Sequence, residues 1–276
     1  MRSCKLPSGT EMPVLGLGTW RMGESARRRA EELDALKYGL GLGYPMIDTA
    51  EMYGEGGAEE IVGDAIGGHG KRPYIVSKVY PHNASHAGTI AACERSLKRM
   101  RIERIDLYLL HWRGGARIEE TFEAFLKLRD AGKIADFGVS NFDKGDMEDA
   151  ARFDKGLNGS NQVLYCLSRR GPEFDLLPWM RKRSIPLMAY SPLDQGGLLR
   201  KAPLKKLADE VGCTPAQLAL AWLLAQPGVV TIPKSSSRER VKENLGALQV
   251  KLTPEIIAEL DRAFPPPRSR QPLEML

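Results

Sequence analysis

Short apolar segments alternate with longer segments of helical periodicity along this chain, and the alternation is repeated eight times. The short segments are rich in β-branched and other apolar residues, so they are interpreted as strands. They lie at residues 14–18, 46–48, 74–78, 105–111, 134–140, 161–165, 186–190 and 229–233. Eight strand–helix units in roughly 250 residues are typical of a barrel of parallel strands surrounded by helices.

Three segments lie outside the eight units. Residues 5–12 have a Ser-Gly turn between short flanks, which predicts a β-hairpin at the floor of the barrel. Residues 203–211 have helical periodicity, and Thr253 followed by proline opens a last helix. The expected fold is therefore an α/β (β/α)₈ TIM barrel with an N-terminal β-hairpin and two extra helices.

The apolar segments are spread evenly, and no linker rich in proline, glycine or serine divides the chain. We therefore expect residues 1–276 to form one barrel domain. The apolar fraction of 42% and the charged fraction of 27% are ordinary for a globular protein. The four cysteines are scattered without a Cys-x-x-Cys pair, and no apolar stretch reaches membrane length. These features predict a cytoplasmic protein with reduced thiols and no membrane association.

The net charge is +5, from 40 basic and 35 acidic residues. Such an excess would help to attract an anionic cofactor, but it is too small to indicate nucleic acid binding. Basic runs at 27–29, 98–101 and 181–183 fall on expected helices or their ends, with acidic residues nearby and no interleaved aromatic residues. We interpret all three runs as solvated helix faces.

Four polar side chains indicate a site of proton transfer. Asp48, Lys78 and His111 each end an expected strand, and Tyr53 lies in the turn that follows Asp48. The carboxyl ends of the strands in a parallel barrel converge on one face, so these groups could meet in one pocket. Taken singly, Tyr53 could be a surface residue and Lys78 could reach solvent. Together, on successive strand ends, they favour a catalytic interpretation.

The chemistry of these groups is complementary. A free tyrosine titrates near ~10 and is a weak acid at neutral pH, but a neighbouring ammonium favours its phenolate. Lys78 could therefore make Tyr53 a better proton donor, and Asp48 could balance the charge of a buried Lys78. His111 can donate a hydrogen bond that orients a carbonyl oxygen.

Two other kinds of site are disfavoured. The segment that begins at Gly16 has arginine at position 21, where the dinucleotide fingerprint of the Rossmann fold needs its third glycine. His82 and His86 are the one pair of histidines at metal-ligand spacing, and they fall in an expected loop. The prediction is accordingly that the protein holds no metal and that a metal-dependent hydrolase on the same barrel is a poor alternative.

Several short segments, in this order, carry a resemblance to a known family. They are residues 47–54 (Ile-Asp-Thr-Ala-Glu-Met-Tyr-Gly), 76–79 (Val-Ser-Lys-Val), 106–112 (Asp-Leu-Tyr-Leu-Leu-His-Trp), 138–142 (Gly-Val-Ser-Asn-Phe) and 232–235 (Ile-Pro-Lys-Ser). From about residue 15 to residue 244 the chain resembles the aldo-keto reductases. It most resembles bacterial members that reduce methylglyoxal and similar small aldehydes.

The resemblance implies a catalytic tetrad in which Tyr53 is the general acid, Lys78 and Asp48 tune it, and His111 orients the substrate carbonyl. It also implies an NADPH site across the mouth of the barrel. The family's cofactor-binding positions correspond to Gly18, Thr19, Trp20, Asp48, Ser140, Asn141, Gln162, Tyr190, Ser191, Pro192, Leu193, Ile232, Pro233, Lys234, Ser235, Arg240, Glu243 and Asn244.

The resemblance implies that different residues bind different parts of the cofactor. Ser140, Asn141 and Gln162 match the positions that bind the carboxamide, and Tyr190 matches the aromatic residue that stacks on the nicotinamide. Ser191, Pro192 and Leu193 follow near the pyrophosphate.

The adenine end of the site favours NADPH over NADH in the same comparison. Lys234, Ser235 and Arg240 could hold a 2′-phosphate at the start of a helix, with Glu243 and Asn244 near the adenine. Ser236 and Glu239 have the spacing of a capping box at this helix.

The substrate side follows from the resemblance as well. Trp20, Tyr80 and Trp112 fall at pocket positions beside Tyr53 and His111, which implies an aromatic and mostly apolar cleft for a small carbonyl compound. The twelve residues after Phe264 form a shorter tail than in many animal members, which predicts a more open pocket.

The resemblance leaves two alternatives to carbonyl reduction. Family members that reduce carbon–carbon double bonds have glutamate in place of His111, so the histidine favours carbonyl reduction. Other relatives are cofactor-binding sensors or regulatory subunits with little turnover, and the intact tetrad disfavours that alternative. The family also implies a monomer.

Overall fold

Eight parallel strands form a closed barrel in the computed structural model, which describes residues 2–276. Each strand pairs with its neighbours in chain order. The barrel closes where Leu15 bridges to Thr231 and Gly18 bridges to Lys234. The strands are β3 (Leu17–Gly18), β4 (Met46–Asp48), β5 (Tyr74–Val79), β6 (Ile105–Leu110), β7 (Ile134–Ser140), β8 (Asn158–Leu164), β9 (Leu187–Tyr190) and β10 (Val229–Thr231). The (β/α)₈ fold predicted from the sequence is confirmed.

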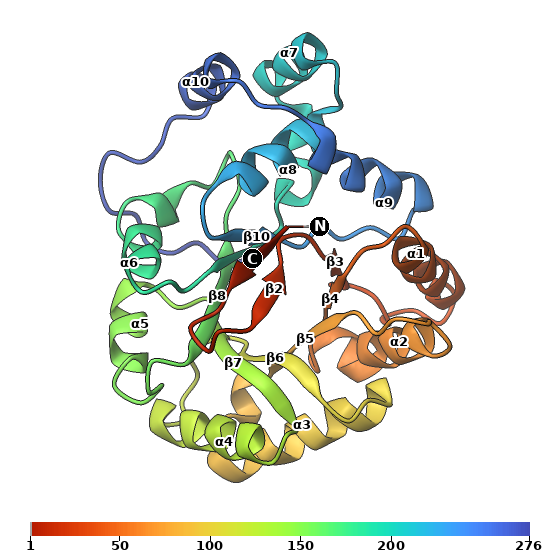
Figure 1. The fold of residues 1–276 in the computed structure, drawn as a ribbon, viewed down its shortest axis with the longest axis vertical. Coiled ribbons are helices and arrows are strands. Elements are labelled where there is room, and N and C mark those ends of the chain that lie inside the picture. The colour runs from red at the N-terminus through yellow and green to blue at the C-terminus, as the bar shows by residue number, and fades with distance from the viewer. Residues whose placement is uncertain (1) are drawn as a thin grey trace.

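Helices surround this barrel (Figure 1). The crossover helices are α1 (Arg29–Gly41), α2 (Gly57–Ile66), α3 (His86–Met100), α4 (Ile118–Asp130), α5 (Lys144–Ala150), α6 (Leu176–Lys182), α8 (Pro215–Ala225) and α9 (Arg238–Leu245). The extra helices α7 (Ala202–Val211) and α10 (Pro254–Ala263) lie together outside this ring (Figure 1). No helix within residues 2–276 is both long and apolar enough to cross a lipid bilayer.

The predicted N-terminal hairpin consists of β1 (Ser3–Lys5) and β2 (Glu11–Pro13), which pair in antiparallel fashion. It crosses one end of the barrel (Figure 1). Leu6 and Met12 of this hairpin pack on Met46, Leu107 and other apolar residues inside the barrel. The hairpin thus closes the floor and leaves the opposite end, where the strands finish, for the site.

Side chains alternate along a strand, so residues two positions apart point in the same direction. Val76 of β5 and Leu109 of β6 belong to the apolar interior of the barrel. Lys78 and His111 each follow two residues later on the same strand path. The polar groups therefore lie directly above an apolar plug, which keeps water away from them on that side.

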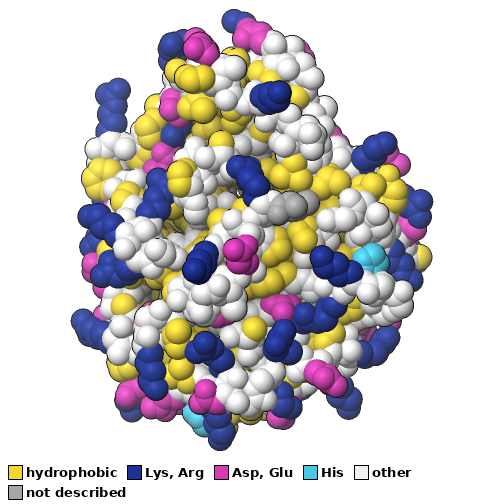
Figure 2. Space-filling view, in the orientation of Figure 1, with side chains coloured by type: hydrophobic (Ala, Val, Ile, Leu, Met, Phe, Trp, Pro, Cys, Tyr) yellow, Lys and Arg dark blue, Asp and Glu magenta, His cyan; other side chains and the backbone are white. Residues whose placement is uncertain are grey.

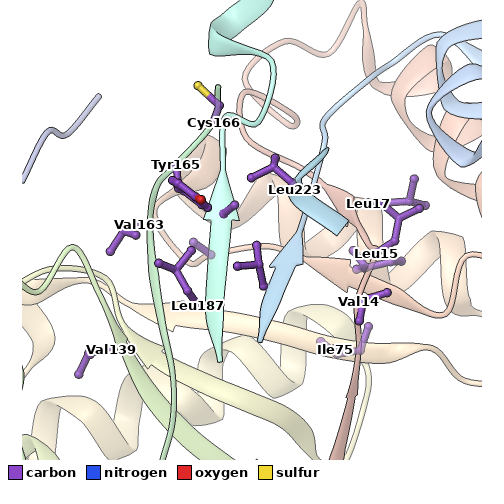
Figure 3. Packing of buried hydrophobic residues seen from close by; sticks show 14 of the residues in the cluster. Val14, Leu15, Leu17, Ile75, Val139, Val163, Tyr165, Cys166, Leu187 and Leu223 are labelled. Carbon is purple, nitrogen blue, oxygen red and sulfur yellow. The ribbon is translucent and has the colours of Figure 1, made fainter. Parts of the chain in front are cut away.

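A second apolar layer lies between the strands and the helices. Val163 of β8, Leu187 of β9 and Leu223 of α8 belong to the same buried cluster (Figure 3). Because Leu187 and its outward-facing neighbours are covered by helices, both faces of the sheet are buried, as a parallel sheet requires. On the face of the molecule drawn in Figure 2, basic and acidic side chains are interspersed, without a continuous basic surface.

Two strands begin three residues away from their predicted start, and the other strand boundaries differ from the prediction by two residues at most. The first strand is confined to Leu17–Gly18, and the residues before it meet β10 through an isolated bridge between Leu15 and Thr231. The strand expected at 161–165 begins earlier, at Asn158. Its first residues are polar but buried, and Ser160 Oγ donates to the Pro186 carbonyl at 3.0 Å. Because these buried polar groups have hydrogen-bond partners inside the protein, a segment with few apolar residues can form a strand in the core.

Candidate functional site

A buried ion pair forms the base of the site. Lys78 Nζ lies 2.7 Å from Asp48 Oδ1, and the side chains are 0% and 2% exposed. Burial lowers the pKa of Lys78 and raises that of Asp48, and each partner opposes the shift of the other. Lys78 Nζ also donates to the Thr49 carbonyl at 2.8 Å, and Gln162 Nε2 donates to Asp48 Oδ2 at 2.7 Å. The expected counter-charge for Lys78 is therefore present, and the pair is held by further hydrogen bonds.

Tyr53 lies in a short helical turn after β4, and Lys78 Nζ donates to its Oη at 3.4 Å. This bond uses the third hydrogen of the ammonium, after those given to Asp48 and Thr49. The Tyr53 oxygen is thus an acceptor from Lys78, which leaves its own hydrogen to be donated elsewhere. The turn depends on Gly54 (φ 57°), where a Cβ would come within 2.6 Å of the Gly23 backbone.

The net pKa of Tyr53 is raised in this structure, although a neighbouring ammonium by itself favours the phenolate. Burial raises the pKa of Tyr53 well above its usual value of 10.0, and the Asp48 carboxylate raises it further. Removing a phenol from water disfavours its anion, and this effect outweighs the attraction of one ammonium that is already paired. Tyr53 is therefore firmly protonated at neutral pH, which is the state that an acid needs before it can donate.

His111 follows β6, and its ring lies edge-on to that of Tyr53 at a centroid distance of 5.6 Å. Burial lowers the pKa of His111 well below 6.5, and the charge of Lys78 lowers it further. The imidazole is therefore neutral at physiological pH. Its Nδ1 is buried and has no hydrogen-bond partner in the described part of the chain. A neutral imidazole can still donate one N–H bond to a substrate oxygen.

The residues matched to the carboxamide are close together. Asn141 has a left-handed backbone (φ 58°), and its Nδ2 donates to the His111 carbonyl at 3.1 Å. Tyr190 Oη donates to Asn141 Oδ1 at 2.9 Å, and Ser140 Oγ donates to the Gln162 carbonyl at 2.8 Å. Within residues 2–276 no hydrogen bond uses Gln162 Oε1, so this acceptor is available to a bound amide group.

A cavity of about 290 Å³ lies over the tetrad. Its wall includes Asp48, Tyr53 and His111, and Lys78 lies behind them. A second cavity, of about 660 Å³, shares part of its wall with the first and extends to α9. The shared residues are Trp20, Ser191, Pro192 and Lys234. All eighteen predicted cofactor positions line one of these cavities or both.

Only some of the residues predicted to bind the substrate line the first cavity. Trp20 and Trp112 line the first cavity, as the resemblance implies. Tyr80 is not in its wall: the ring stacks on His82 and lies edge-on to Trp112 at 5.2 Å, so it supports that indole from behind. Sequence reasoning did not single out Met52, Met275 and Leu276, which also line the cavity.

The short tail nevertheless reaches the site. After α10 the chain passes near α6 and ends over the barrel axis (Figure 1). Arg270 pairs with Asp175 at 3.3 Å, and Glu274 pairs with Arg169 at 3.2 Å. These ion pairs hold the tail against the barrel and explain how residues so distant in sequence from the tetrad join its cavity.

Cationic side chains contribute to the wall of the second cavity. Lys234 and Arg240 both line it, and Lys234 Nζ donates to Ser236 Oγ at 3.1 Å. The predicted cap at Ser236 is wrong by one residue, because Ser237 Oγ accepts from the Arg240 amide and α9 begins after it. Ser236 faces Lys234 instead. Burial lowers the pKa of Lys234, as expected for a cation held partly away from water.

A (β/α)₈ barrel with a tyrosine, a lysine, an aspartate and a histidine at the mouth defines a class of oxidoreductase. The chain belongs to the aldo/keto reductase family, whose family model matches residues 14–264. The resemblance stated from the sequence motifs is thereby confirmed.

Individual relatives agree with this assignment. The chain is 45% identical over 271 residues to the methylglyoxal reductase YeaE of Escherichia coli, covering 96% of this chain and 95% of that protein. It is 35% identical to a glyoxal reductase of Bacillus subtilis, covering 93% and 91%. The crystal structure of an aldo-keto reductase from Klebsiella pneumoniae in complex with NADPH has a TM-score of 0.95 and 46% identity, covering 100% of this chain and 99% of that one.

Proposed function

We propose that this protein reduces aldehydes or ketones to alcohols with NADPH, and that Tyr53 is the general acid. The observation that supports the proposal most strongly is the direction of the hydrogen bond between Lys78 and Tyr53. Its oxygen accepts from Lys78, and Tyr53 lines a cavity that His111 also lines. The Tyr53 hydrogen can therefore be given to an oxygen atom in that cavity.

The residues present fit NADPH on two observations. At one end of the joined cavities, Lys234 and Arg240 provide positive charge for a phosphate. At the other end, Gln162 Oε1 can accept from a carboxamide beside the tetrad. The K. pneumoniae relative was crystallised with NADPH, which favours the same cofactor here. When bound, NADPH would supply a hydride to the carbonyl carbon.

The tetrad would complete the reduction at the carbonyl oxygen. A neutral His111 would donate one N–H bond that orients this oxygen toward Tyr53. As negative charge develops on the oxygen, Tyr53 would transfer its proton to it. The phenolate left behind would lie 3.4 Å from the Lys78 ammonium, whose attraction is strong in a buried site. Lys78 would thus act on the product of the proton transfer.

The proposed substrates are small aldehydes such as methylglyoxal. The cavity beside the tetrad is limited by Trp20, Met52 and Trp112, which leaves room for a compact apolar group. The relatives from E. coli and B. subtilis are named as reductases of methylglyoxal and glyoxal.

We also propose that the protein acts as a monomer.

A cofactor and substrate comparison tests this proposal. With methylglyoxal, kcat/KM should be at least about tenfold higher with NADPH than with NADH, because a charged hydrogen bond contributes roughly 1.5–3 kcal/mol. Initial rates can be followed by the absorbance of the reduced cofactor. Equal efficiency with the two cofactors would contradict the phosphate site at Lys234 and Arg240. A single turnover followed by tight retention of oxidised cofactor would instead favour the sensor alternative.

The pH dependence should be flat over a wide range. Tyr53 can donate only when protonated, and burial raises its pKa well above 10.0. His111 should be neutral, and burial lowers its pKa well below 6.5. Neither group therefore changes charge between these values, and kcat for carbonyl reduction should vary by less than about threefold from about pH 6.5 to 10. Initial rates at saturating substrate and NADPH provide the test. A fall in kcat with a midpoint near pH 8 would contradict it.

A further inference from the structure

Two cations from distant parts of the chain meet at a single neutral oxygen. Arg28 Nη2 donates to Ser236 Oγ at 3.2 Å, although the two residues are 208 positions apart. Lys234 Nζ donates to the same oxygen at 3.1 Å. All three residues line the cavity that extends to α9. A serine hydroxyl has no charge with which to balance an ammonium and a guanidinium.

The two cations repel one another, although the nearby carboxylates of Glu31 and Glu32 oppose this effect. Arg28 is close enough to Lys234 that its charge adds to burial in lowering the pKa of the lysine. Like charges that converge on one side of a cavity, rather than turning away, are typical of a site for an anion. Arg240 lines the same cavity, as do Arg21 and Arg200, so five cationic side chains in all contribute to its wall.

Two carboxylates of α1 hold the Arg28 side chain in position. Glu31 Oε2 and Glu32 Oε1 lie 3.7 and 3.9 Å from Arg28 Nε, which is attraction without a direct hydrogen bond. Glu32 is 1% exposed, and its Oε2 accepts from the Gly23 amide at 3.0 Å. The buried carboxylate therefore fixes the loop before α1 and holds the guanidinium over the cavity. Nη2 remains directed at Ser236.

The three arginines at 27–29 separate into different roles. Arg29 pairs with Asp64 on α2, and Arg27 is exposed. No ion pair or hydrogen bond of the Arg27 side chain occurs among residues 2–276. Arg28 is also solvent-exposed, with 48% of its side-chain surface accessible, as expected for a solvated helix face, but it contacts Ser236 as well. Its contact with Ser236 across the barrel closure could not be read from helical spacing.

We propose that Arg28 is a further determinant of cofactor specificity, which binds the 2′-phosphate of NADPH together with Lys234 and Arg240. This inference rests on the proposed function, since it takes NADPH as the cofactor. The phosphate oxygens would replace Ser236 Oγ as the main acceptors, and a planar guanidinium suits them because it can donate two parallel bonds.

The test is a binding titration without substrate, so that its result does not depend on turnover. Intrinsic fluorescence would be followed while NADPH or NADH is added to the wild type, Arg28→Met and the matched control Arg27→Met. We expect Arg28→Met to raise the Kd for NADPH about tenfold and to change the Kd for NADH less than twofold. Arg27→Met should change neither value by more than about twofold.

Two further measurements keep the test specific. Arg28→Lys, which keeps the charge but loses the fork of donors, should recover only part of the NADPH affinity. Titration with 2′-AMP and 5′-AMP should show that Arg28→Met weakens binding of the 2′-phosphate alone. Unchanged NADPH affinity, or an equal loss for NADPH and NADH, would overturn the role of Arg28. Failure of the proposed function would look different, because then wild-type protein would bind NADPH without reducing any aldehyde.

Discussion

Replacing Tyr53 with phenylalanine should lower kcat for aldehyde reduction by ~10²- to 10⁴-fold, which is the usual contribution of a positioned general acid. The phenyl ring keeps the packing beside His111 but has no proton to give. Because the carbonyl oxygen would still meet His111, a small residual rate should persist. Steady-state rates with a small aldehyde and saturating NADPH measure the effect.

The control for Tyr53→Phe is cofactor binding. The hydroxyl contacts Lys78, which does not line either cavity. The Kd for NADPH should therefore stay within about threefold of the wild-type value. If Tyr53→Phe reduces aldehydes at the wild-type rate, another group supplies the proton and the proposed mechanism is wrong.

Replacing Lys78 with methionine should affect both stability and catalysis. The change leaves Asp48, which is 2% exposed, as a buried carboxylate without its counter-charge. Breaking a buried pair in this way typically costs about 3–5 kcal/mol in the free energy of unfolding. The kcat should fall by about 10²-fold or more, because the Tyr53 phenolate would have no cation beside it. Urea unfolding and steady-state rates measure the two effects.

A double variant separates these two consequences of Lys78→Met. Adding Asp48→Asn removes the unpaired charge and leaves an amide that Gln162 can still contact. The free energy of unfolding should then recover most of the loss, while kcat stays low. If Lys78→Met unfolds at the same urea concentration as the wild type, the buried ion pair does not contribute as proposed.

Much of the site could be predicted because strand geometry is regular. Once Met46, Val76 and Leu109 are assigned to the barrel interior, the alternation of side chains brings Asp48, Lys78 and His111 to its mouth. Likewise, the order of the strands in the barrel follows from the alternation of short apolar segments with helical segments along the chain. Periodicity therefore predicted both the fold and the meeting of the tetrad.

Other features depend on quantities that spacing does not contain. The pKa of Tyr53 is raised by burial and by the Asp48 carboxylate, and the degree of burial was not known from the sequence. Contacts across the barrel closure, such as that of Arg28 with Ser236, join segments with no common periodicity. The position of Leu276 in the cavity wall depends on the path of an irregular tail.

The walls of the two cavities share Trp20, Ser191, Pro192 and Lys234. In the proposed complex the nicotinamide end of the reductant would share the first cavity with the compound to be reduced, whereas its adenine end would lie in the second. Changes in Met52 or Trp112 can alter which compounds enter without touching the cation-lined end. Relatives with this arrangement can therefore evolve to reduce new compounds while they continue to use the same reduced cofactor.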